Sequence, residues 1–305
     1  ALPTGSARRI PQMSDVFNYG GNSGLSGIPG TVAQGYETDL VEVVKEKKSR
    51  RKSIDLNVVC PMAGKFFCLS DWKRSVSRLP LERSHVLVHD NGNNPKFSER
   101  VLSHCQKTFD SYTFVRDKNP HIPEHLRHDC PSLSARCDAF YSHIYENLIN
   151  HRLPLCLNLE DDVVIPDDSF QKLHHVIQDE AIGTVIGQCN DRRDFVYRGS
   201  TSSISVDFDV RARIGVQPEL EVSVIHVPEK ARGVDCIGAG HMGLWLTKTE
   251  AVRSIGVGRQ QYNGLNGTDI NWGFALNSAG LDFAIDWSIK MRHLFKDVHG
   301  KKQSC

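Results

Sequence analysis

The stretch LPLCLNLEDDVVIPDD, residues 153–168, runs an apolar segment directly into three adjacent carboxylates and then becomes apolar again. Adjacent carboxylates repel one another, and a carboxylate flanked by apolar residues needs a cation or a proton. Glu160 and Asp162 can point the same way, because side chains alternate along an extended chain. Their oxygens suit Mg²⁺ or Mn²⁺ shared with a phosphate-bearing substrate. The alternative is a helix-capping acidic turn, which explains Asp167 and Asp168 but not acids that precede Val-Val-Ile.

Segments with strand and helix periodicity alternate on both sides of this stretch. Strands are expected at 54–60, 85–90, 111–117, 155–160 and 183–189, and helices at 69–79, 97–109, 131–151 and 167–177. Such alternation predicts an α/β fold with a doubly wound, mostly parallel sheet and helices on both faces. Ligands of such sheets bind at the carboxyl ends of the strands, where Asp90 and Glu160–Asp162 are expected.

The rest of the chain divides by composition. Residues 1–53 read as an N-terminal arm or linker, in which 35–53 are a short helix or strand ending in a basic cluster at 45–52. Residues 54–295 form the expected domain, with a β-rich insertion at 190–235, and 296–305 form a tail. After the insertion we expect a strand, two helices and a last strand, at 241–247, 248–255, 267–280 and 281–287.

Bulk composition limits the function classes. The chain has 305 residues, 24% of them charged, and a formal net charge of +1, so no global field draws it to nucleic acid or membrane. It contains no apolar run long enough to span a bilayer, and its start lacks the apolar core of a signal peptide. Nine cysteines without a CxxC pair are typical of buried thiols, so we expect a cytoplasmic protein (host cytoplasm if the source is viral).

Three further positions have two interpretations each. Asp90 closes an apolar strand and precedes Asn-Gly-Asn-Asn, so it either forms an Asx-type turn or binds a nucleobase or ribose. Asp269 opens a helix after a glycine-rich turn, where capping alone could explain it. The glycines at 238–243, Gly240 among them, permit either a bend or the close approach of a sugar.

Taken in their order along the chain, these motifs resemble those of the GT-A nucleotide-sugar glycosyltransferases, especially the family-2-like group. In the amino-terminal half, NVVCP (57–61) resembles the opening strand with its following proline, Pro61, and Asp90 matches the strand-end acid that contacts the nucleoside. Ser134-Ala135-Arg136-Cys137-Asp138 is similar to the family's "ARN" stretch, with Cys in place of Asn. Glu160-Asp161-Asp162 matches the DXD metal motif.

The carboxyl-terminal half continues the resemblance, which covers about 54–295. The segment 238–256 is similar to the family's glycine-containing strand and helix, and 275–285 to its helix ending in Ala-Gly before a strand. Thr268-Asp269 matches the "ED" motif that supplies the catalytic base, with Thr replacing the acid. His293 matches the carboxyl-terminal metal-binding histidine.

The resemblance implies a mechanism. Mn²⁺ or Mg²⁺, held by Asp162 with Glu160 and His293, would neutralise the diphosphate of a nucleoside diphosphate sugar, with a UDP-sugar as the expected donor. Asp269 would deprotonate the acceptor hydroxyl in one inverting displacement. The other expected donor contacts are Asp90 to the nucleobase, Asp161 to the donor sugar or ribose, Arg136 to the diphosphate, and Pro61 and Gly240 in the donor pocket. Trp272 and Trp287 would stack on sugar or belong to the core.

Other interpretations stay open. A nucleotidyltransferase also uses strand-end acids, but would have a glycine-rich basic loop that CPMAGKFF lacks, and a catalytically inactive glycan- or metal-binding module would keep the same fold. The acceptor could be a saccharide, or a hydroxymethylated base in DNA as for some bacteriophage enzymes. The basic cluster 45–52 and an arginine-rich stretch favour the second acceptor (Arg192, Arg193, Arg198, Arg211 and Arg213). No membrane partner is expected.

Overall fold

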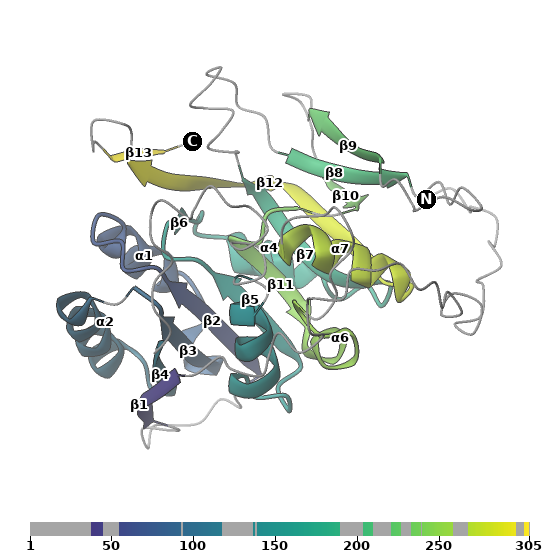
Figure 1. Ribbon diagram of the computed structural model, residues 1–305. Coiled ribbons are helices and arrows are strands. Elements are labelled where there is room, and N and C mark those ends of the chain that lie inside the picture. The colour runs from purple at the N-terminus through teal and green to yellow at the C-terminus, as the bar shows by residue number, and fades with distance from the viewer. Residues whose placement is uncertain are drawn as a thin grey trace, which may run out of the picture. The chain divides into compact units, whose positions relative to one another are not determined.

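The computed structural model of the chain describes residues 38–44, 55–92, 94–117, 137, 139–189, 204–209, 221–226, 233–238, 240–258, 268–296 and 302–304. Most of its strands join one mixed sheet (Figure 1). Its strands are β1 (Thr38–Val44), β2 (Leu56–Met62), β3 (Ser84–Asp90), β4 (Tyr112–Asp117), β5 (Leu155–Leu159), β6 (Val163–Val164), β7 (Ile182–Cys189), β10 (Val234–Ile237), β11 (Leu244–Lys248), β12 (Asp282–Lys296) and β13 (Lys302–Ser304). A separate hairpin pairs β8 (Ile204–Asp209) with β9 (Glu221–His226).

The order of the strands indicates where the sheet would bind a ligand. Along the sheet the order is β1-β4-β3-β2-β5-β11-β7-β12-β10, with β6 and β13 also paired to β12. The neighbours β4, β3, β2 and β5 run parallel, as do β7 and β12, whereas β11 is antiparallel to both β5 and β7. The chain leaves β2 toward β3 and later returns to β5 on its other side, which is the topological switch point where such sheets bind ligands.

Helices cover both faces of the sheet and form two apolar cores. One core contains α1 (Leu69–Val76), α2 (Pro95–Thr108) and α4 (Ser169–Val176), and the other contains the helical residues 139–148, α6 (Thr249–Ile255) and α7 (Thr268–Ser278). Figure 1 shows α1 and α2 on one side of the sheet and α6 and α7 on the other. Strand β2 is buried along its whole length because Val58 faces the first core and its neighbour Val59 the second.

The predicted strands and helices of the described part are present, although the last strand is longer than predicted, and β8, β9 and β10 bear out the β-rich character of 190–235. The strand interpretation of 35–53 is confirmed for β1, and β13 lies in the expected tail; both pair with the main sheet. Asp168 occupies the N-cap of α4, but its carboxylate pairs with Lys172 (2.8 Å) instead of capping. The domain boundaries stay predictions.

The last predicted strand is too short. Instead of ending at 287, β12 continues to Lys296, and from Ser288 to Met291 exposed polar residues alternate with buried Ile289 and Met291. This period-two pattern is that of a strand with one buried face. His293 therefore lies inside a strand and not in the segment after one.

Two expectations from composition can be compared with the described residues. Cys60 and Cys156 are buried free thiols, as expected for cysteines in apolar runs. None of the helices that the structure describes has the length and hydrophobicity that crossing a bilayer requires.

Candidate active site

The three adjacent acids, Glu160–Asp162 (the acidic turn), directly follow β5 at the carboxyl edge of the parallel strands. The backbone N–H of Glu160 donates to the carbonyl of Gly243 (3.0 Å), and the N–H of Leu294 donates to the carbonyl of Asp162 (2.8 Å). Because β6 also pairs with β12, segments that are distant in the sequence meet here, namely 160–164, 240–243 and 292–294.

Asp162 is 2% exposed, and only one of its two carboxylate oxygens accepts hydrogen bonds from described residues. Its Oδ2 accepts hydrogen bonds from the Lys65 ammonium and from His293 Nε2 (3.1 Å). Its Oδ1 is buried and receives no hydrogen bond from any described residue. Burial alone would raise the pKa of this carboxyl, but His293 and Lys65 outweigh burial and lower it, so Asp162 is ionised.

Asp161 points toward the loop that follows β2. Its Oδ2 accepts a hydrogen bond from the backbone N–H of Ala63 (2.9 Å), and its Oδ1 lies 3.7 Å from Lys65 Nζ. Burial raises the pKa of Asp161 to about 7, against the lowering effect of Lys65. The structure thus ties Asp161 to the loop after β2, through Ala63 and Lys65.

Lys65 is a site residue that sequence reasoning missed. Its side chain is 31% exposed and contacts both Asp161 and Asp162. Burial alone would lower the pKa of Lys65, but the two carboxylates raise it above its usual range. The sequence signal was its place three residues beyond β2, which becomes informative only once β2 and β5 are known to be neighbours.

Glu160, His241 and His293 (the ligand trio) can hold a metal ion. Each offers one ligand atom, and these atoms all lie within 4.8 Å of one another. The Tyr141 hydroxyl donates to Glu160 Oε1 (2.7 Å), which fixes the carboxylate. Carboxylate and imidazole donors suit Mn²⁺ and fit a divalent cation. Asp162, the expected ligand, is not one of the trio and reaches it through the hydrogen bond that its Oδ2 accepts from His293.

His241 was not singled out from the sequence beyond its place among the glycines. Gly243 N–H donates to His241 Nδ1 (2.9 Å), and the rings of His241 and His293 lie 5.0 Å apart. A Cβ at position 243 would lie 2.8 Å from His241 Cε1 and 2.7 Å from Val163 Cγ2, so only glycine lets the ring pack here. Residues 240–243 are also held by Asn158 of β5, whose side-chain amide donates to the carbonyl of Met242 (2.8 Å).

Asp90 lies at the expected strand end and is buried. Its Oδ1 accepts from the N–H of Gly92 (3.0 Å) and its Oδ2 from the Ser98 hydroxyl, which is the Asx-type arrangement. Burial raises the pKa of Asp90. The loops after β2 and β3 touch through glycine, since a Cβ on Gly92 would lie 2.4 Å from the Cα of Gly64. A nucleoside contact by Asp90 stays a prediction.

The other predicted site residues lie on several elements. Pro61 lies in β2 opposite His89 of β3, and Gly240 is buried against Ile186. Asp269 is half-buried in the first turn of α7, which leads directly into β12. Arg136 lies outside the described residues, as do the basic cluster 45–52 and the arginine-rich stretch.

The two tryptophans belong to the core. Trp272 is 1% exposed and donates to Thr184 Oγ1 (3.0 Å), and Trp287 is 4% exposed and donates to Asp235 Oδ2 (2.5 Å). Both indoles are therefore packed and hydrogen-bonded within the protein, which is the core alternative and not the stacking one.

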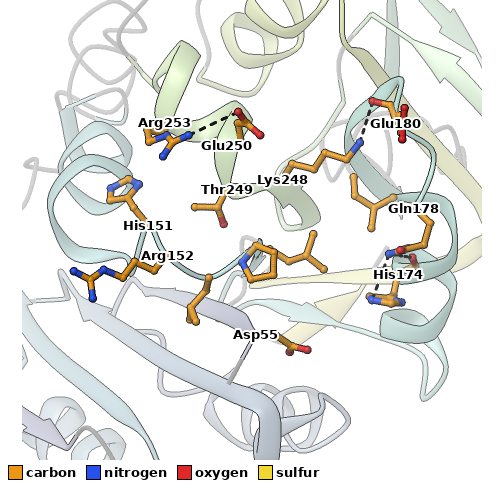
Figure 2. Close-up of a pocket in the computed structure, with 14 residues that line it drawn as sticks. Asp55, His151, Arg152, His174, Gln178, Glu180, Lys248, Thr249, Glu250 and Arg253 are labelled. Atoms are coloured by element: carbon orange, nitrogen blue, oxygen red, sulfur yellow. Dashed lines mark hydrogen bonds and ion pairs between the residues drawn. The ribbon is translucent and has the colours of Figure 1, made fainter. Parts of the chain in front are cut away.

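A pocket of about 500 Å³ lies at the opposite edge of the sheet. Figure 2 shows that its lining comes from the residue before β2 (Asp55), the segment before β5 (His151, Arg152) and the end of β11 (Lys248). Since β5 begins here and ends at the acidic turn, this pocket is separate from the ligand trio.

The sequence matches no family model and no curated protein. Among solved structures, the chain resembles GalNAc-T7 with UDP, GalNAc and Mn²⁺, with a TM-score of 0.52 and 10% identity over 80% of this chain and 43% of that one. It also matches the mannosyltransferase PcManGT from Pyrobaculum calidifontis in complex with GDP-Man and Mn²⁺, with a TM-score of 0.47 and 12% identity over 81% and 58% of the two chains. The chain thus spans about half the length of these proteins. The likeness confirms the predicted GT-A fold.

Proposed function

We propose that the protein is a metal-dependent glycosyltransferase that moves a sugar from a nucleoside diphosphate sugar to an acceptor hydroxyl. The observation that carries this proposal is the ligand trio at the switch point of a GT-A fold, where Glu160, His241 and His293 converge. The presence of UDP and Mn²⁺ in the similar GalNAc-T7 structure supports this donor class, and we propose a UDP-sugar.

Mn²⁺ or Mg²⁺ bound at this place would neutralise the charge that develops on the leaving diphosphate. Glu160, His241 and His293 would hold the cation, and Tyr141 keeps the Glu160 carboxylate in position. Asp162 orients His293 by accepting a hydrogen bond from Nε2, and its Oδ1, which has no hydrogen-bond donor among the described residues, would be a further ligand.

The proposed acceptor side rests on Asp269. Helix α7 leads into β12, the strand that carries His293, through residues 279–281, and we propose that the first turn of α7 lies near the metal ligands. A carboxylate there is suited to take the proton of an acceptor hydroxyl, which implies a single displacement with inversion. Asp90 and Pro61 would line the nucleoside side.

For the acceptor, we propose a saccharide hydroxyl or a hydroxymethylated base in DNA, the latter through the basic cluster 45–52. Contacts to DNA phosphates release counterions, so activity on DNA would fall steeply with added salt. Activity on DNA that is indifferent to salt would remove the nucleic-acid acceptor.

The test is binding and slow hydrolysis of a panel of nucleotide sugars, with and without Mn²⁺, by wild type, Glu160→Gln and Glu250→Gln. Glu250 lies at the opposite edge, is exposed, and serves as the matched control. We expect Mn²⁺-dependent binding and hydrolysis of one donor by wild type and Glu250→Gln, and loss of at least 100-fold in Glu160→Gln. If wild type binds no nucleotide sugar, the fold would serve as a binding module and the proposal fails.

A further inference from the structure

In this structure, the charge of the acidic turn is neutralised by a lysine of the same chain, Lys65. Lys65 Nζ donates to Asp162 Oδ2 and lies 3.7 Å from Asp161 Oδ1. Among the described residues, no other lysine or arginine forms an ion pair with this turn. The repulsion between adjacent acids is thus relieved by an ammonium that reaches across from the loop after β2.

This pairing is incomplete in a way that a purely structural ion pair is not. A buried ion pair is favourable only when the remaining lone pairs are also satisfied. Here Asp162 Oδ1 is buried without a hydrogen-bond donor among the described residues, and one ammonium serves two carboxylates. The carboxylate therefore has one oxygen that accepts hydrogen bonds and one buried oxygen, without a donor among the described residues, that a further cation would satisfy.

The surroundings of Lys65 also allow its side chain to change position. Its side chain is 31% exposed, so solvent reaches it from one side. The four-carbon stem of lysine turns easily, and its ammonium acts as a point charge without a fixed geometry. The residue before it, Gly64, has a φ of 74° and marks a tight bend in the loop.

We propose that Lys65 is a displaceable internal cation, which neutralises the acidic turn in the resting protein, gives way when a divalent metal binds there, and then pairs with the diphosphate of the donor. The inference rests on the proposed function, both for the divalent metal that displaces Lys65 and for the diphosphate that then pairs with it. It makes Lys65 a residue that sets metal affinity and contacts the leaving group, joining the two halves of the donor site.

The first test titrates Mn²⁺ without any donor into wild type, Lys65→Met and Lys172→Met, followed by calorimetry. Lys172→Met removes one lysine from an exposed pair with Asp168 and controls for net charge. We expect Mn²⁺ to bind Lys65→Met at least tenfold more tightly than wild type, and Lys172→Met to match wild type. Equal or weaker Mn²⁺ binding by Lys65→Met, or no binding by either protein, overturns the proposal.

The second test needs no substitution, and so does not depend on whether Lys65→Met folds. Wild type is treated with acetic anhydride, and acetylation of Lys65 is quantified by mass spectrometry with and without Mn²⁺. We expect at least a threefold rise in acetylation when Mn²⁺ binds and a fall when a nucleoside diphosphate is added as well. Acetylation that is unchanged while Mn²⁺ binds overturns the displacement.

The two proposals fail separately. If wild type hydrolyses a nucleotide sugar equally well in excess chelator, Lys65 is a permanent cation: the displacement is overturned, and so is the metal dependence, while sugar transfer stands. If Mn²⁺ displaces Lys65 but no nucleotide sugar binds, displacement stands and the glycosyltransferase assignment falls.

Discussion

At the scale of single residues, the site depends on hydrogen bonds that fix the ligand trio. Tyr141 is 8% exposed, and its hydroxyl donates to Glu160 Oε1. The pKa of Tyr141 is raised well above its usual value by burial and by Glu160, so the hydroxyl stays a donor over the whole working range of pH. Such outer groups typically change metal affinity by about 10- to 100-fold.

We therefore expect Tyr141→Phe to weaken Mn²⁺ binding by about tenfold. The ring and its packing against Phe140 and Tyr145 are kept, so the midpoint of thermal unfolding without metal should change little. Calorimetric titration of Mn²⁺ and thermal unfolding measure the two effects. An unchanged Mn²⁺ affinity would show that Glu160 is oriented without Tyr141.

At the scale of elements, the turn 240–243 before β11 decides whether His241 reaches the site. The N–H of Gly243 donates to the His241 ring, and the side-chain amide of Asn158, a fully buried residue of β5, donates to the carbonyl of Met242. Asn158 in turn accepts a hydrogen bond from the Tyr145 hydroxyl (3.0 Å). Glycine is needed because both His241 and Val163 occupy the space that a Cβ would take.

Gly243→Ala is expected to push His241 away from Glu160 and to weaken Mn²⁺ binding at least tenfold. Overpacking should also destabilise the fold by about 1–3 kcal/mol. The matched control is Gly280→Ala, where φ is 78° and no atom lies near the new methyl group. It should cost about 1–2 kcal/mol through backbone strain and leave Mn²⁺ affinity unchanged. Equal losses of affinity in both variants would contradict this role for Gly243.

At the scale of the whole molecule, the ligand trio joins parts of the chain that are more than 130 residues apart, from Glu160 after β5 to His293 in β12. A ligand that binds only the folded state stabilises it by mass action, by about 2.7 kcal/mol at 100 times its Kd. For a domain of this size, that corresponds to a rise in Tm of roughly 5–10 °C.

We expect Mn²⁺ at that concentration to raise the Tm of wild type by about 5 °C or more. Glu160→Gln should lose this rise, whereas Glu250→Gln should keep it. Scanning calorimetry with and without Mn²⁺ measures all three. A rise of the same size in Glu160→Gln would place the metal away from the ligand trio.

The sequence by itself determined the layers of the fold and one side of the site. Strand and helix periodicity is set by neighbours along the chain, so β2, β3, β4, β5 and their helices were predictable, and adjacent acids with no local partner indicated a cation. The extension of β12 was missed because half of its residues are polar, as befits a strand with one exposed face.

Only the tertiary structure decided which partners those acids meet. Lys65 and His241 carry no signal in their own neighbourhoods, because their roles depend on β2 and β11 lying on either side of β5. The order of strands in a sheet follows from which apolar faces pack together across the whole chain, and no local pattern encodes it. The acids were readable from the sequence, and the lysine and the histidine that meet them were not.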